Sequence, residues 1–90
     1  MIVLNGRKYK LIENFRDAFQ EEVVAKRYAE VLGKYDFIVG DWGYDQLRMK
    51  GFYHPHQKKA NYDTRIDYVE DYLYEYCNFG CPYFILQKVD

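Results

Sequence analysis

The spacing of apolar residues changes several times along the 90-residue chain, and each change predicts a different element. Two short strand-like runs, 1–4 and 8–12, flank the dipeptide Asn5-Gly6. This dipeptide readily supplies the positive φ angles of a tight two-residue turn. The chain is therefore expected to open with a β-hairpin.

Two stretches carry apolar residues at helical spacing. The first is capped by Asn14 and closed by Gly33, and the second is capped by Asp63 or Thr64 and closed by residues 78–80. The apolar stripe of the first is Phe19, Val23, Val24, Tyr28, Val31 and Leu32. That of the second is Ile66, Val69, Leu73, Tyr76 and Cys77. Each stripe predicts an amphipathic helix that packs on a sheet.

Three further strands are predicted. Residues 35–39 form a short β-rich run, and a turn at 40–43 leads into a return strand with alternating sides, while 83–89 is nearly continuous in apolar character. In the return strand the core side is Leu47, Met49, Gly51 and Tyr53, and the other side is Gln46, Arg48, Lys50 and Phe52. The last strand is expected to be central or covered on both faces.

The element order is ββαββαβ, with a polar, Pro-containing loop at 54–61 after the return strand. This order predicts a single α+β domain over residues 1–90, with a mainly antiparallel sheet of about five strands and two helices. The sheet could also be split into two layers.

Aromatic residues make up 20% of the chain, and eleven of them are tyrosines. Because each phenol needs water or a partner, much of this aromatic area is expected to reach the surface. The net charge of −1 gives no overall attraction to nucleic acid or anionic lipid. Charge is nevertheless uneven, since the net charge is +2 over 41–65, which also holds both histidines, and −4 over 66–90.

No apolar run approaches the length of a signal peptide or a membrane span. A cytoplasmic protein without membrane partners is therefore expected. Its two cysteines, Cys77 and Cys81, are expected to be reduced and largely buried, with a redox-sensitive pair as the alternative.

Two long runs of unusual composition, Phe37–Tyr53 and Tyr72–Leu86, resemble the YutD-like family, a group of small bacterial proteins classed as a domain of unknown function. The resemblance spans nearly the whole chain. It implies an α+β fold in a cytoplasmic bacterial protein, and it transfers no catalytic or binding residue.

Enzymatic and metal chemistry find little support. The chain has no serine, and Asp41 and Asp45 beside Trp42 and Tyr44 are explained more simply by a turn than by paired catalytic carboxylates. Weak zinc candidates are His54, His56, Cys77 and Cys81, whose spacing does not fit a structural zinc site. We expect no catalytic residue and no cofactor, and a small enzyme or zinc-binding protein is the third interpretation.

A nucleic-acid-binding role has a more specific basis. The inner order βαββαβ is that of the RNA-recognition module, and Lys50-Gly51-Phe52 falls on the strand that carries stacking aromatics in that module. If the Phe52 face were open, bases would stack on its rings while basic groups bound phosphate. The residues predicted to bind RNA or single-stranded nucleic acid are Trp42, Arg48, Lys50, Phe52, His54, Lys58 and Lys59. The competing interpretation is that this face is a second core layer.

A protein-binding role is the alternative to nucleic-acid binding. The predicted second helix carries Tyr68, Tyr72 and Tyr74 among acidic residues, a composition common at interfaces. Such a surface could bind another protein, or pair with the basic strand and loop of a second copy. A non-enzymatic binding module is the function that the sequence favours.

Overall fold

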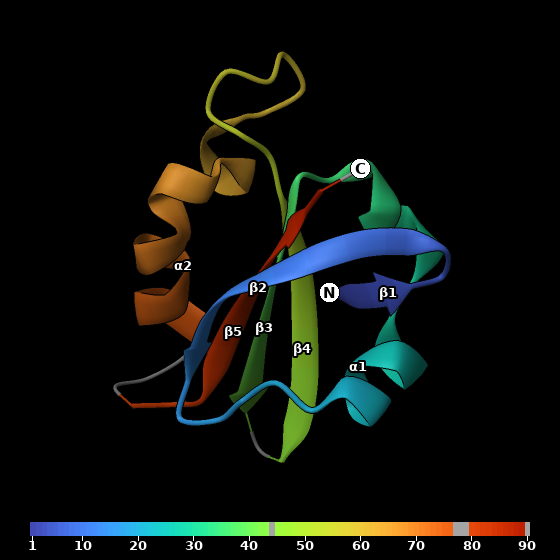
Figure 1. Ribbon diagram of the computed structural model, residues 1–90. Helices are drawn as coiled ribbons and strands as arrows, with labels where there is room; N and C mark the ends of the chain where they lie inside the picture. Colours follow the sequence, from blue (N-terminus) through green and yellow to red (C-terminus); the bar gives the residue numbers. More distant parts are fainter. Residues whose placement is uncertain (44, 77–79, 90) are drawn as a thin grey trace.

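The computed structural model describes residues 1–43, 45–76 and 80–89, apart from the side chain of Tyr76. Its five strands are β1 (Ile2–Leu4), β2 (Arg7–Phe15), β3 (Phe37–Gly43), β4 (Gln46–Phe52) and β5 (Tyr83–Lys88). These strands pair antiparallel, in the order β1-β2-β5-β3-β4. The helices α1 (Glu21–Arg27) and α2 (Val69–Tyr76) lie on opposite sides of the curled sheet (Figure 1). The predicted α+β class is confirmed.

The opening hairpin forms as predicted, because Asn5 and Gly6 adopt φ angles of 51° and 80°. Its second strand, however, continues to Phe15, where it pairs with Tyr83 of β5. Asn14 therefore lies in a strand, and its predicted position at the start of a helix is wrong. Its side chain still accepts a hydrogen bond from the backbone N–H of Phe19, at 3.0 Å.

The first helix is much shorter than its apolar pattern suggests. Helix α1 spans only Glu21–Arg27, and the chain then becomes extended before the 3₁₀ helix η1 (Glu30–Lys34). Two consecutive residues with positive φ, Arg16 and Asp17, separate β2 from α1. L-residues rarely continue a helix from that conformation, so the helix begins later than predicted.

Strand β3 extends through the segment that was expected to be a turn. Gly40, Asp41 and Trp42 all pair with β4, and the turn comes later, at Asp45 with a φ angle of 63°. Gly40 is needed within the strand because a Cβ atom there would overlap the ring of Phe84 on β5. The longer strand places Asp41 and Trp42 on opposite faces of the sheet.

Strand β5 lies between β2 and β3, and both of its faces are covered, as predicted. Phe84 and Leu86 belong to the core on the α1 side, which also contains Leu4, Tyr9, Ala18, Val24, Leu32, Ile38 and Leu47. Ile85 belongs to a second core on the α2 side, with Phe37, Val39 and Phe52. The sheet thus separates two hydrophobic cores.

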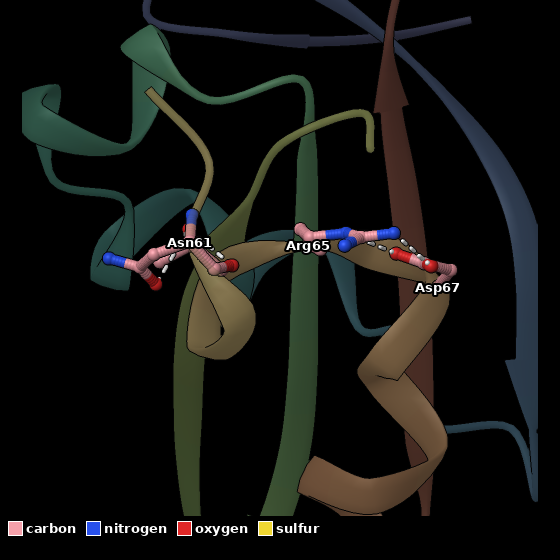
Figure 2. Close-up of polar contacts among 4 residues, drawn as sticks. Asn61, Arg65 and Asp67 are labelled. Carbon is pink, nitrogen blue, oxygen red and sulfur yellow. Dashed lines mark hydrogen bonds and ion pairs between the residues drawn. The ribbon is translucent and has the colours of Figure 1, made fainter. Parts of the chain in front are cut away.

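Two short 3₁₀ helices, η2 (Tyr62–Thr64) and η3 (Ile66–Tyr68), lead into α2. The cap of η2 is Asn61, whose side chain accepts a hydrogen bond from Asp63 N–H at 3.0 Å, while Thr64 Oγ1 accepts one from Asn61 N–H at 3.0 Å. Figure 2 shows this cap beside Arg65 and Asp67. The prediction that Asp63 or Thr64 caps the second helix is therefore wrong: Thr64 completes the cap of η2 as the partner of Asn61, and α2 begins only at Val69. No helix in the described part of the chain is long and apolar enough to cross a membrane.

Candidate protein-binding site

Phe52 is buried under α2, so the predicted open face does not exist. Its side chain is 1% exposed, and its ring meets the ring of Tyr72 edge-on, with the centroids 5.5 Å apart. The residues that cover this face are Ile66, Val69, Tyr72, Leu73 and Tyr83. The alternation predicted for β4 is confirmed, but the expectation that its Phe52 side faces solvent is wrong. Phe52 has no free ring face on which a base could stack.

Arg48 forms an ion pair with a buried carboxylate. Asp41 lies directly across from it on β3 and is 0% exposed. Arg48 Nη2 lies 2.7 Å from Asp41 Oδ1, and Arg48 Nε donates a hydrogen bond to the same oxygen at 2.9 Å. The hydroxyl of Tyr72 donates to Asp41 Oδ2 at 3.2 Å. These bonds satisfy the buried charge and tie α2 to the sheet.

Lys50 also packs against the protein rather than standing free. Its ammonium lies 4.9 Å from the ring centroid of Phe52 and 5.7 Å from that of Tyr72. It donates a hydrogen bond to the carbonyl oxygen of Asp63 at 2.9 Å. Lys50 therefore joins the edge of the sheet to η2 and α2.

Trp42 lies on the opposite face, half-buried beside α1-side residues. Its indole N–H donates to the carbonyl oxygen of Ala18 at 2.8 Å. It lines a cavity of about 410 Å³ together with Arg16, Asp17, Ala18, Gln20, Asp45 and Pro82. Asp45 borders this cavity, whereas Asp41 is buried under α2, so the structure does not bring these two carboxylates together. Tyr44 lies outside the described residues.

The remaining predicted binding residues lie on the exposed loop after β4, which projects from the body of the protein (Figure 1). Lys58 and Lys59 are exposed there. His54 is exposed too, although its ring packs edge-on against Phe37 with centroids 4.8 Å apart. Of the predicted cationic residues, those of the loop are thus separated from Arg48 and Lys50, which bind within the fold.

The zinc hypothesis loses one of its ligands. Cys81 is disulfide-bonded, so the prediction that it is reduced is wrong, and it has no thiolate to offer a metal. Cys77 lies outside the described residues, and His54 and His56 are both exposed. Within the described ranges, no three His, Cys, Asp or Glu side chains are grouped closely enough to hold a metal ion.

The open surface around α2 contains a cleft of about 340 Å³ that we call the acidic tyrosine cleft. Its lining residues are Lys50, Tyr62, Asp63, Tyr68, Asp71, Tyr72 and Glu75. The rings of Tyr62 and Tyr68 lie against each other, with centroids 4.2 Å apart, and the hydroxyl of Tyr62 donates to Asp71 Oδ2 at 3.1 Å. This hydrogen bond and the charge of Asp71 raise the pKa of Tyr62 above its ordinary value.

The sequence pattern predicted part of this cleft. Tyr68 and Tyr72 were expected beside acidic residues of the second helix, but the wall formed by Tyr62 and Asp63 was not. The pair Asn61 and Thr64 carried the missing signal, because Asn followed three residues later by Thr favours a capped helical turn. That turn places Tyr62 and Asp63 against α2.

Comparison with known proteins gives a family. A family model described as "Putative antitoxin YutD-like" matches residues 3–87. The chain belongs to the YutD-like family. This confirms the resemblance seen in the sequence.

A Bacillus subtilis relative, compared in sequence and in structure, shows how far the likeness extends. A YutD-like protein of Bacillus subtilis (strain 168), described as "Putative antitoxin YutD", is 49% identical over 89 residues, which are 99% of this chain and 98% of the relative. The solution NMR structure of protein yutD from B. subtilis aligns with a TM-score of 0.81 at 48% identity, over 99% of this chain and 82% of that one. The YutD-like fold is therefore shared along the chain.

Proposed function

We propose that this protein is a protein-binding module that neutralises a partner protein, and that it binds this partner with the surface around α2. The observation that carries the proposal is the contrast between the two sides of α2. The inner side covers the aromatic sheet face with Tyr72 and Leu73, and the outer side exposes Glu70, Asp71 and Glu75 beside the acidic tyrosine cleft. Tyrosine is enriched at protein interfaces, and exposed charge adds selectivity for a partner of opposite charge.

The family model and the B. subtilis relative are both described as "putative antitoxin", which supports the same direction, because neutralising a toxin by direct contact requires a protein interface. A shared fold alone would not be evidence for this function. The buried state of Phe52 also weighs for a protein partner, since it removes the stacking surface on which nucleic-acid recognition would depend.

The test is capture followed by a growth assay. The tagged protein and an Asp71→Lys/Glu75→Lys variant are used to capture proteins from a lysate of the bacterium that encodes it. A Glu21→Lys/Glu22→Lys variant makes the same charge change on exposed positions of α1 and serves as the matched control. Proteins retained by the wild type and the control, but lost with the α2 variant, are then expressed alone and together with the wild type.

We expect at least one such protein to arrest growth when expressed alone and to lose this effect when co-expressed. The proposal fails if no captured protein depends on the α2 surface. It also fails if none of those that do is toxic, because binding without neutralisation is not the activity proposed.

Nucleic-acid binding is the second candidate, supported by the exposed cations of Lys58 and Lys59 on the projecting loop. A titration with mixed-sequence RNA and single-stranded DNA at low and high salt tests it. Binding at low salt that is lost in a Lys58→Ala/Lys59→Ala variant would support this candidate. Absence of binding at low salt removes it.

A further inference from the structure

Aromatic walls of the acidic tyrosine cleft already hold cations. The guanidinium of Arg65 lies 5.0 Å from the ring centroid of Tyr68, and the ammonium of Lys50 lies 5.7 Å from that of Tyr72. The faces of aromatic rings carry negative potential and attract cations. The rings of the cleft are thus placed where positive groups are stable.

These internal cations are fixed by other groups and do not neutralise the cleft. Arg65 Nε and Nη2 donate to the two carboxylate oxygens of Asp67, at 3.2 and 2.8 Å (Figure 2). Lys50 is held by the carbonyl oxygen of Asp63, as described above. Neither interaction reaches Asp71 or Glu75.

The two carboxylates of α2 that line the cleft lack a compensating charge. Asp71 accepts one hydrogen bond, from Tyr62, and Glu75 has no hydrogen bond or ion pair within the described ranges. They stand four positions apart, where like charges destabilise a helix by about 0.2–0.5 kcal/mol. The last turn of α2 has no basic residue, although a cation is favoured at that end of a helix. An external cation would relieve both unfavourable effects.

The shape of the site favours a planar cation. The rings of Tyr62 and Tyr68 form one wall, and the Oδ2 oxygen of Asp71 is occupied by Tyr62 while its Oδ1 oxygen remains available. A guanidinium stacks flat on a ring and donates several hydrogen bonds in its plane at the same time. A compact, strongly hydrated ammonium does not fit both the ring wall and the carboxylate equally well.

We infer that the acidic tyrosine cleft receives an arginine side chain of the partner protein, with the guanidinium against the exposed ring of Tyr62 and paired with Asp71 and Glu75. The cleft volume of about 340 Å³ is sufficient to take one long side chain. This inference rests on the proposed function, because it specifies what the α2 surface recognises. It assigns the partner an exposed, arginine-bearing segment.

The experiment uses short Gly/Ser peptides that differ only at one central residue: arginine, lysine or the uncharged isostere citrulline. Each is titrated into the ¹⁵N-labelled protein at low salt, and backbone amide shifts are followed. We expect the arginine peptide to shift the amides of residues 62–75, to bind at least about threefold more tightly than the lysine peptide, and to lose binding when citrulline replaces arginine.

Two variants locate the contact. Asp71→Asn/Glu75→Gln keeps the shape of both side chains and should lower the affinity for the arginine peptide by about tenfold, which corresponds to about 1.4 kcal/mol of binding free energy. Glu21→Gln/Glu22→Gln removes the same charge from α1 and should leave the affinity unchanged. Equal weakening by both variants, shifts spread over the surface, or equal affinity for lysine would each overturn the inference.

The peptide titration needs no knowledge of the partner, so its failure is distinguishable from failure of the proposed function. If capture and growth rescue succeed while the arginine peptide does not bind at the cleft, only the arginine inference is wrong. If the peptide binds at the cleft but no captured protein is neutralised, the proposed function is wrong.

Discussion

Asp41 is a buried carboxylate on which two elements depend. Arg48 binds it from the neighbouring strand, and Tyr72 binds it from α2. A buried charge that loses its partner costs far more than an exposed one, because neither water nor another group replaces the lost bonds. The exposed pair formed by Arg65 and Asp67, whose side chains are 35% and 43% exposed, offers a comparison within the same protein.

We predict that Arg48→Met lowers the free energy of unfolding by about 2 to 3 kcal/mol, because Asp41 would keep only the bond from Tyr72. Arg65→Met removes an arginine from the exposed pair and should cost less than about 1 kcal/mol. Urea unfolding followed by Trp42 fluorescence measures both. Similar losses of unfolding free energy in the two variants would mean that buried Asp41 does not depend on Arg48 for its stability.

The environment of Tyr83 predicts that the free energy of unfolding depends on pH. Burial, and then the hydrogen bond that its hydroxyl donates to Glu13 at 2.9 Å, raise its pKa above 10.0. The folded state therefore keeps this proton at a pH where the unfolded chain has lost it. The stabilisation is complete below about pH 10 and is lost as the pH rises through the raised value.

In a Tyr83→Phe variant, the free energy of unfolding should fall less steeply above about pH 9 than in the wild type. Urea unfolding at several pH values measures the slope. An unchanged slope would show that this phenol titrates alike in both states.

At the scale of elements, the sequence correctly predicted which sides of the strands are apolar, but not which elements pack against those sides. The alternation in β4 correctly placed Phe52 opposite Leu47, and the apolar run of β5 correctly indicated two covered faces. What covers the Phe52 face depends on where α2 packs, which no local pattern encodes. For the same reason Asn14 was predicted to cap a helix although it lies in β2, since its strand partner β5 lies about seventy residues further along.

Phe52→Ala tests the role of α2 as the cover of the second core. We expect a loss of about 3 to 5 kcal/mol in the free energy of unfolding, because a buried ring is removed from contact with Tyr72. Ile12→Ala, at a side chain that is 45% exposed on β2, should cost less than about 1 kcal/mol. A small loss at Phe52 would indicate that α2 leaves this face open in solution.

At the scale of the whole molecule, the sheet is joined through its last strand. Strand β5 pairs with β2 on one side and with β3 on the other, so the N-terminal hairpin and the β3–β4 hairpin share no direct strand pairing. Both hydrophobic cores also take residues from β5. The two halves of the sheet are therefore one cooperative unit only when β5 is present.

A variant that ends at Pro82 should lack cooperative thermal unfolding, because both cores lose their central strand. Removal of Met1–Val3, where the side chains of Met1 and Val3 are 84% and 56% exposed, should leave a folded but less stable protein. Far-UV circular dichroism and one-dimensional proton NMR distinguish the two outcomes. Dispersed amide signals from the chain that ends at Pro82 would contradict this description of the sheet.

The central place of β5 also matters during translation. A ribosome adds residues in order, at about 5–20 per second, so the earlier strands emerge seconds before the strand that joins them. During that interval the apolar sides of the two hairpins have no permanent cover and are open to chaperones and proteases. The amount of mature protein in a cell should thus depend on how quickly the codons after residue 82 are read, and rare codons placed there would lower the yield without changing a single amino acid.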